Sequence, residues 1–212
     1  EIFGECVTTM EVRDALYIIF GYLLGSILFA RLGGLIFKKT DIMAESPDKN
    51  PGTMNAFTYG GFRCGVFTLC GDLFKGFLPV FLYRSGELPE NPLMLSFVMA
   101  APVLGHILPF YDIKHGGKGI AATGGFMFAL DVRIALIAAI VFAVVFFTTR
   151  YVSVGSLTIT ALFPILMLIF YPGQWVVFGL SLVFTALAWW RHRANIKRLM
   201  NGTENKFEKK KR

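Results

Sequence analysis

The chain has 212 residues, of which 55% are hydrophobic and 15% aromatic, and its formal net charge is +7. Its mean hydropathy is +0.59, and the apolar residues stand in long blocks, which excludes an ordinary soluble domain and indicates an integral membrane protein. Much of the positive charge lies between Arg191 and Arg212. Beside a hydrophobic helix, such a tail indicates contact with anionic lipid rather than with nucleic acid.

Seven apolar segments follow one another along the chain, and each is predicted to be a helix. Several are shorter than the roughly 20 residues that a straight span needs, and the fourth, which is rich in glycine, is a candidate for a re-entrant helix. The sequence therefore predicts an all-α integral membrane protein of about seven transmembrane helices, in a single domain over residues 1–212 that ends in a basic tail at 199–212. The segments are 15–37, 62–83, 92–110, 120–130, 134–148, 152–170 and 175–190.

The distribution of Lys and Arg predicts the orientation of these helices. With seven spans, a cytoplasmic C-terminus places the N-terminus outside, and the inside loops then hold most of the cations. Three polar segments share the cytoplasmic face in this arrangement, residues 41–61, 112–119 and 191–205. Because one membrane surface carries all three, we expect them to build one polar site.

The first polar segment contains the stretch "DKNPGTMN" at residues 48–55. Pro51 and Gly52 favour a turn, and Asn50 and Asn55 supply side-chain amides. Read alone, the stretch is also consistent with a plain interfacial turn.

The second polar segment runs into the loop "HGGKGIAATGG" at residues 115–125. Gly116, Gly117 and Gly119 flank Lys118, and glycines let the backbone approach an anion closely. A helix that begins just after Lys118 adds the positive end of its dipole. The loop therefore favours phosphate binding, with a flexible turn as the alternative. Two such loops on one face favour a shared phosphate site.

The third polar segment ends the last apolar helix in "WWRHRANIKRLMNG". His192 and Asn195 are three residues apart and lie on one face of a helix. His192 is a candidate for a general base or for a donor to phosphate. The alternative is a basic helix that contacts lipid headgroups.

Charged side chains also occur inside the apolar segments. Asp72 and Lys75 are three residues apart on one predicted helix, and charges at membrane depth are usually paired. We expect an ion pair that supports helix packing, with a direct catalytic role as the alternative. His106 is expected to support the structure as well, and Arg31 is expected to extend its charge to the membrane interface.

Seven motifs stand in order along nearly the whole chain: "GYLLGSILFA" at 21–30, "NPGTMN" at 50–55, "DLFKGFLPV" at 72–80, "GHILPF" at 105–110, "GGKGIAATGG" at 116–125, "RYVSVGS" at 150–156 and "RHRANIKRLMNG" at 191–202. Together they resemble the motifs of the acylphosphate-dependent glycerol-3-phosphate acyltransferases of bacterial membranes, the PlsY family.

The resemblance implies a seven-helix enzyme of the bacterial inner (plasma) membrane, with its active site on the cytoplasmic side. Such an enzyme moves a fatty acyl group from acyl phosphate to the 1-hydroxyl of glycerol 3-phosphate and gives lysophosphatidate for phospholipid synthesis. It uses no acyl-CoA, no metal and no other cofactor. The expected partners are the two substrates and membrane lipid, and we expect a monomer.

By position, the resemblance implies that Lys118, His192 and Asn195 are catalytic. The residues expected to bind substrate lie in or beside the first two polar segments: Asp48, Lys49, Asn50, Gly52, Thr53, Asn55, Arg63, Gly116, Gly117 and Gly119.

The first loop departs from the family pattern, which is close to Gly-Ser-Gly-Asn-x-Gly-Ala-Thr-Asn with an arginine three residues later. Here Asp48 stands at the serine position, Lys49 at the second glycine, Met54 at the threonine and Thr58 at the arginine. A carboxylate that faces phosphate is repulsive unless it is paired. We therefore expect Lys49 to pair with Asp48, and Arg63 to replace the missing cation.

These departures leave alternatives to the family reaction. The first is an acyltransferase of the same fold that uses another polyol or its phosphate as acceptor. The second is a protein that is not an enzyme, either an anion transporter or a catalytically silent paralogue. Clustering of the polar motifs at one face argues against a transporter, since transporter sites lie near the bilayer midplane.

Overall fold

The computed structural model describes residues 10–86 and 91–207, and the regular structure in these ranges is entirely helical. The chain divides into two compact units, Glu1–Leu130 and Asp131–Arg212. Compact units can belong to one domain, so the single domain expected over residues 1–212 stays a prediction. Lys209, Lys210, Lys211 and Arg212 of the basic tail lie outside the described residues.

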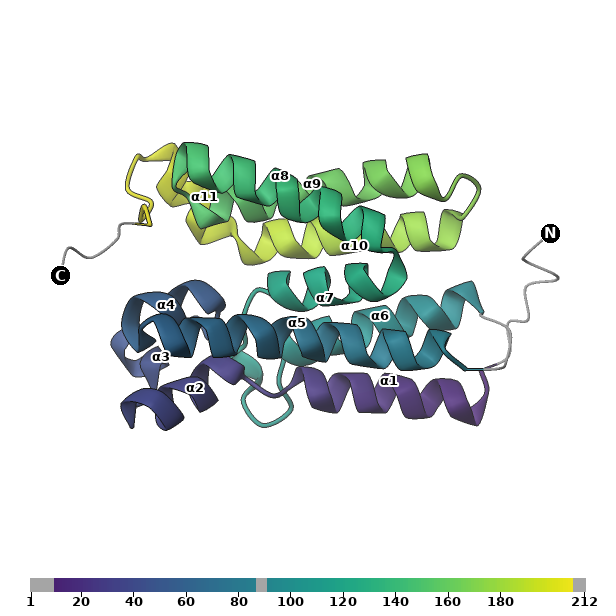
Figure 1. Cartoon of the computed structure of the whole chain (residues 1–212), viewed down its shortest axis with the longest axis horizontal. Coiled ribbons are helices and arrows are strands. Elements are labelled where there is room, and N and C mark those ends of the chain that lie inside the picture. Colours follow the sequence, from purple (N-terminus) through teal and green to yellow (C-terminus); the bar gives the residue numbers. More distant parts are fainter. Residues whose placement is uncertain (1–9, 87–90, 208–212) are drawn as a thin grey trace. The chain divides into compact units, whose positions relative to one another are not determined.

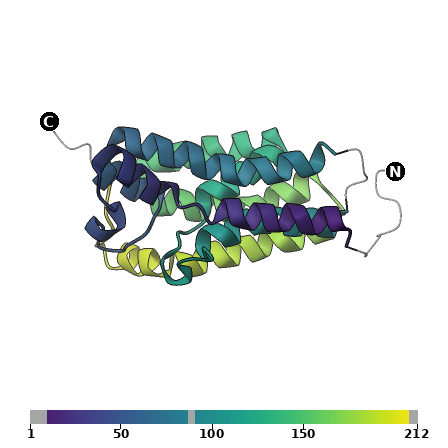
Figure 2. The same ribbon diagram turned by 90° about the horizontal axis from the view of Figure 1, so that it is seen from below.

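The first unit is organised around α5 (Phe62–Arg84), which contacts α1, α2, α4, α6 and α7 (Figure 1). Seen from below, α1 and α2 again follow one another along the unit, with a short connection between them (Figure 2). The other elements are α1 (Val12–Gly25), α2 (Phe29–Lys38), α3 (Ile42–Glu45), α4 (Thr53–Gly60), α6 (Pro92–Ile107), η1 (Ile113–His115) and α7 (Ile120–Leu130).

The second unit places α9 in contact with both α8 and α10. The short helix α11 follows α10 after a turn at His192. Its elements are α8 (Val132–Thr149), α9 (Val152–Phe170), α10 (Trp175–Arg191) and α11 (Arg193–Met200).

The seven predicted apolar segments all coincide with helices, so the prediction of an all-helical membrane protein is confirmed. Within the described residues, four stretches are long and apolar enough to cross a membrane, and three apolar helices are shorter. The shortest, α7, has 11 residues, which gives a length of about 17 Å against about 30 Å for the hydrocarbon core. The orientation of the helices stays a prediction.

Capping residues explain where several helices begin. The side chain of Asp41 accepts a hydrogen bond from Met43 N at the start of α3. The side chain of Asn91 accepts a hydrogen bond from Leu93 N at the start of α6, and Pro92 occupies the first position of that helix. Asp131 caps α8 through Arg133 N. These side chains satisfy backbone N–H groups that have no partner inside the helix.

The outward faces of the long helices are apolar. Leu16, Ile19 and Leu23 of α1 are exposed, as are Ile140 and Phe147 of α8. Exposed apolar surface of this extent is costly in water and favourable in lipid. The faces therefore fit contact with acyl chains.

The first apolar segment was predicted as one helix over 15–37, but the structure breaks it after Gly25. A glycine–serine pair, Gly25 and Ser26, stands at the break, as is common where helices bend sharply. Two carbonyl groups near the break are satisfied from other elements. Lys75 Nζ donates to Ile27 O at 2.7 Å, and the hydroxyl of Tyr111 donates to Ser26 O at 2.9 Å.

The donor Lys75 is itself part of a buried charge cluster. Its Nζ lies 2.7 Å from Asp72 Oδ1, and both side chains are essentially inaccessible. His106 of α6 places Nδ1 3.5 Å from the same oxygen. The contact expected between Asp72 and Lys75 is thus present, and the cluster joins the helix break to α5 and α6.

This cluster generates a test of stability. Lys75→Met leaves the Asp72 carboxylate without its ammonium and Ile27 O without its donor. Breaking a buried ion pair costs about 3–5 kcal/mol, so we expect the midpoint of thermal unfolding in detergent to fall by about 10 °C. The double variant Asp72→Leu, Lys75→Met removes both charges and is expected to recover much of the loss. An unchanged midpoint for Lys75→Met alone would show that the pair is not needed.

Candidate functional site

The loop between α3 and α4 is held together by its own side chains. Asp48 Oδ1 accepts hydrogen bonds from Asn55 Nδ2 at 2.7 Å and from Asn50 N at 3.3 Å. Asn55 Nδ2 also donates to Asn50 O at 2.9 Å. The amide of Asn55 therefore braces the loop, and the carboxylate of Asp48 is turned back into it.

The expected ion pair between Asp48 and Lys49 is not among the contacts of the described residues. Lys49 instead has a left-handed backbone, with φ of +48°. The family pattern quoted above has a glycine here, the residue that adopts this conformation without a steric penalty. The left-handed backbone of Lys49 is therefore consistent with the glycine of the family pattern. Gly52 caps α4 by its backbone, Thr53 begins that helix, and Arg63 is exposed in the first turn of α5.

The glycine loop packs tightly against the end of α6. Gly117 N donates to His106 O at 2.9 Å. A Cβ atom at Gly117 would lie 1.9 Å from His106 Nε2, and one at Gly116 would lie 1.9 Å from Ile107 O. Any side chain at either position would collide with α6. These two glycines are therefore required by packing, whether or not they also contact a ligand.

Lys118 stands between buried glycines and just before the first turn of α7. Its side chain is half-buried, whereas Gly117 and Gly119 are buried. A cation beside the N-terminus of an 11-residue helix provides two sources of positive potential at one point. This arrangement suits a phosphate group.

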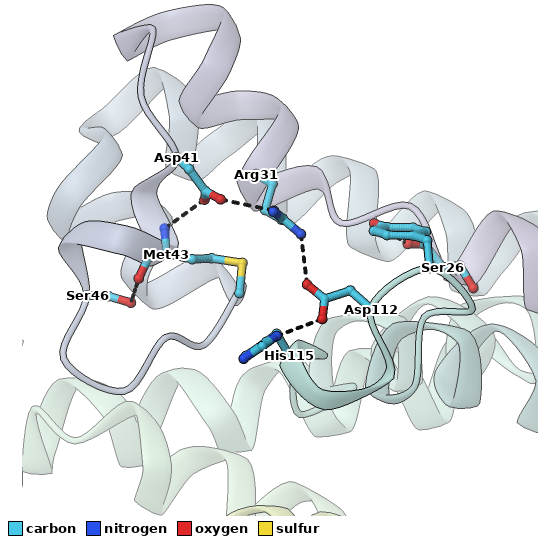
Figure 3. Close-up of polar contacts among 8 residues, drawn as sticks. Ser26, Arg31, Asp41, Met43, Ser46, Asp112 and His115 are labelled. Atoms are coloured by element: carbon cyan, nitrogen blue, oxygen red, sulfur yellow. Dashed lines mark hydrogen bonds and ion pairs between the residues drawn. The ribbon is translucent and has the colours of Figure 1, made fainter.

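Arg31 of α2 joins the two loops of the first unit (Figure 3). Its Nε lies 3.1 Å from Asp41 Oδ2, and its Nη1 lies 3.1 Å from Asp112 Oδ2. That Arg31 extends its charge to the membrane interface stays a prediction, and the structure adds two carboxylate partners that the sequence did not suggest. Its partners are 10 and 81 residues away in the chain, which is why its local sequence did not reveal them.

Asp112 also contacts a histidine through its other carboxylate oxygen. His115 Nδ1 lies 2.6 Å from Asp112 Oδ1 (Figure 3). The hydrogen bond from His115, followed by the charges of His115 and Arg31, outweighs partial burial and lowers the pKa of the Asp112 carboxyl. Asp112 is therefore a carboxylate at neutral pH, directly before the glycine loop.

In the second unit, His192 occupies the turn between α10 and α11 and is 3% exposed. Its Nδ1 lies 2.8 Å from Ala188 O. A carbonyl oxygen only accepts, so Nδ1 carries the hydrogen and Nε2 is the nitrogen that accepts when the ring is neutral. The backbone thus fixes the tautomer that a base or an acceptor of a hydroxyl hydrogen bond requires.

Asn195 lies in α11, three residues after His192, and is also buried. Its Nδ2 donates to Glu204 Oε1 at 2.7 Å, and Arg198 Nε donates to Glu204 Oε2 at 2.6 Å. Burial opposes ionisation, but these hydrogen bonds and the charge of Arg198 lower the pKa of the Glu204 carboxyl. Glu204 was not selected from the sequence. The available signal was an acidic residue within a strongly basic tail.

The beginning of the predicted basic tail is folded back within the second unit. Phe207 N donates to Arg150 O at 2.9 Å, and the Phe207 ring packs on Phe146 with centroids 5.6 Å apart. Lys206 lies over the ring of Tyr151. Residues up to Phe207 are therefore part of the packed structure, and this part of the tail is not a simple lipid-binding extension.

The structure thus sorts the candidate residues by unit. The first unit holds the Asp48–Asn55 loop and Lys118, and Arg31 ties the segments that lead into them. The second unit holds His192 and Asn195 on one helical turn. The first unit thus holds a cation in a glycine loop, and the second holds an oriented imidazole and a buried amide.

Comparison with known proteins gives consistent matches. The family model described as glycerol-3-phosphate acyltransferase matches residues 15–202. The glycerol-3-phosphate acyltransferase of Shouchella clausii is 37% identical over 198 residues, which cover 91% of this chain and 95% of that protein. That of Methylobacillus flagellatus is 38% identical over 203 residues, covering 94% and 100%.

Two crystal structures of PlsY (YgiH), an integral membrane glycerol 3-phosphate acyltransferase, are also similar. The glycerol 3-phosphate form superposes with a TM-score of 0.82 at 33% identity, covering 92% of this chain and 96% of that one. The lysophosphatidic acid form gives 0.80 at 33% identity, covering 92% and 95%. Each similarity extends over nearly the full length of both chains.

The packing of the glycine loop can be tested by adding one methyl group. Gly117→Ala places a Cβ against His106, and overpacking of this kind costs about 1–3 kcal/mol. We expect the unfolding midpoint to fall by about 5 °C. Gly179→Ala is the matched control, since a Cβ there meets nothing within 4 Å. Equal midpoints for the two variants would contradict the contact with α6.

The role of Glu204 can be tested through pH. Its pKa is lowered in the folded protein from an ordinary value of 4.5. The stabilisation from its carboxylate is therefore complete above that value and is lost as the pH falls through the lowered pKa. We expect Glu204→Gln to unfold at a lower temperature than the wild type at pH 7, with the difference shrinking below pH 4.5. A difference that does not depend on pH would show that the charge is not what stabilises the turn.

Proposed function

The chain belongs to the glycerol-3-phosphate acyltransferase family, enzymes that make lysophosphatidate, and we propose that its acyl donor is acyl phosphate and its acceptor the 1-hydroxyl of glycerol 3-phosphate. The observation that carries the proposal is the position of Lys118. The glycines around it are fixed against α6, and α7 begins directly after it. A phosphate group is the ligand that this combination of cation and helix N-terminus favours.

In the reaction, the glycerol hydroxyl oxygen forms a bond with the acyl carbonyl carbon. The bond from that carbon to the phosphate oxygen then breaks, and inorganic phosphate leaves. Lys118 and the loop N–H groups hold phosphate and stabilise the negative charge that develops on the tetrahedral centre. Acyl phosphate is already activated, so placing the two substrates together supplies much of the rate.

His192 and Asn195 orient the acceptor in this proposal. The hydrogen on Nδ1 of His192 is committed to Ala188 O, which directs Nε2 to the role of acceptor. The proton of the attacking hydroxyl passes either to Nε2 or to an oxygen of the substrate phosphate. If a His192→Gln variant keeps most of kcat, the imidazole is not needed as the base, and the substrate phosphate accepts the proton of the attacking hydroxyl.

The loop around Asp48 is consistent with glycerol 3-phosphate as acceptor. An altered acceptor was suggested by the carboxylate at a position where the family pattern has serine. In the structure, that carboxylate accepts from Asn55 and Asn50 within its own loop, so a structural role accounts for it. Asn50, Gly52, Thr53 and Arg63 complete the proposed substrate-binding set. We further propose a monomer in the plasma membrane of a bacterium, with the active site facing the cytoplasm.

The test is acyl transfer by the purified protein in lipid nanodiscs, with palmitoyl phosphate and glycerol 3-phosphate as substrates and lysophosphatidate as the measured product. We expect Lys118→Met to lower kcat/KM at least about hundredfold, as removal of an oxyanion-stabilising group does. Lys114→Met, four residues earlier on the exposed turn η1, is the matched control and should keep full activity.

Additional substrates separate the alternatives. Palmitoyl-CoA should not replace palmitoyl phosphate, and other polyol phosphates should be poor acceptors. Transfer only to another acceptor would overturn the assignment of glycerol 3-phosphate. No transfer from a folded protein, or full activity of Lys118→Met, would overturn the proposed chemistry.

A further inference from the structure

We infer that Arg31 is a positioning residue for acyl transfer, which holds the two substrate loops of the first unit in one fixed arrangement by binding a carboxylate at the entrance to each. This inference rests on the proposed function of those loops. It assigns a role to a side chain outside the sequence motifs that carry phosphate chemistry.

The first observation is that two different nitrogens of one guanidinium are used. Nε binds Asp41, and Nη1 binds Asp112, each at 3.1 Å (Figure 3). The planar fork of arginine fixes the angle between these two bonds. A lysine ammonium at the same place would supply the charge without that fixed angle.

The second observation is that each carboxylate uses its other oxygen within its own loop. Asp41 Oδ1 accepts from Met43 N at 3.0 Å and so starts α3, which leads into the Asp48–Asn55 loop. Asp112 Oδ1 contacts His115 Nδ1 at 2.6 Å, three residues before Lys118. The position of the guanidinium is therefore passed to both loops through direct bonds.

The third observation is that further hydrogen bonds continue from these carboxylates toward the substrate residues. Ser46 Oγ donates to Met43 O, and Lys49 N donates to Ser46 O, next to Asp48. On the other side, His115 N donates to Asp112 O, and Gly117 N is fixed to His106 O. These bonds lie between Arg31 and the two proposed phosphate contacts, so we expect a displaced guanidinium to displace both loops.

The exposure of the two ion pairs separates a positioning role for Arg31 from a role in stability. The side chains of Arg31, Asp41 and Asp112 are 35%, 33% and 25% exposed. Ion pairs with this degree of exposure contribute little to global stability. Geometry is a more sensitive property, because an error of about 1 Å in substrate position can lower the rate by about a hundredfold. Loss of Arg31 should therefore affect turnover much more than unfolding.

The charge of Arg31 also supports a role in turnover. Without Arg31, two carboxylates at the entrance to a phosphate site lose a shared cation, and like charges repel the incoming substrates. The two effects can be separated by variants that keep shape and change charge. Arg31→Lys keeps the charge and loses the fork, whereas Asp112→Asn keeps the shape and removes one carboxylate.

The experiment measures kcat and KM for palmitoyl phosphate and glycerol 3-phosphate, together with the midpoint of thermal unfolding. The proteins compared are the wild type, the single variants Arg31→Ala, Arg31→Lys and Asp112→Asn, and the double variant that combines Arg31→Ala with Asp112→Asn. We expect Arg31→Ala to lower kcat/KM about tenfold to a hundredfold with a midpoint within about 2 °C of the wild type. Arg31→Lys should recover only a minor part of the kcat/KM that Arg31→Ala loses. The matched control is Arg133→Ala, which breaks an ion pair of 2.7 Å with Asp131 and should leave kcat/KM unchanged.

The double variant distinguishes positioning from direct contact. If Arg31 acts through Asp112, the double variant should be little worse than either single variant, because coupled residues are not additive. Multiplied losses would show that Arg31 contacts substrate itself and would overturn the inference, as would full recovery by Arg31→Lys or an unchanged rate for Arg31→Ala. A wild type that forms no lysophosphatidate would instead reject the proposed function.

Discussion

The structure of the first unit depends on one constraint, which is that a helix broken inside a packed bundle must have its freed carbonyl groups satisfied by other parts of the protein. Lys75 reaches Ile27 O, and Tyr111 reaches Ser26 O. A carbonyl group that is buried without such a bond is costly. Because Lys75 is charged, it in turn requires Asp72, so a break in α1–α2 leads to an ion pair inside the bundle.

The same break explains how loops distant in sequence are held. The segment after α6 is attached to the broken helix at three points: Tyr22 to Leu108 O, Tyr111 to Ser26 O, and Arg31 to Asp112. This segment leads directly into the glycine loop and Lys118. The bonds that satisfy the broken helix thus also hold the segment that leads to the proposed phosphate site, and catalysis by positioning requires such support.

The sequence allowed the helices and the glycine loop to be predicted, because both depend on local pattern. Long apolar runs mark helices, and "GGKG" marks a close approach of backbone. The break at Ser26 was missed because the apolar run continues through it and its partners lie 48 and 85 residues away. The two partners of Arg31 were missed for the same reason. Asp48 and Lys49 were read as a charge pair, but hydrogen bonds and a left-handed turn decide their places, and neither is visible in composition.

The most direct test of this account is hydrogen–deuterium exchange of the wild type and Tyr111→Phe. The variant removes one hydroxyl, and so one bond to the broken helix, without burying a charge. Loss of a bond worth about 1 kcal/mol should speed amide exchange over residues 112–119 by about fivefold, while exchange in α9 of the second unit stays the same. Unchanged exchange over residues 112–119 would contradict the claim that the helix break holds the glycine loop.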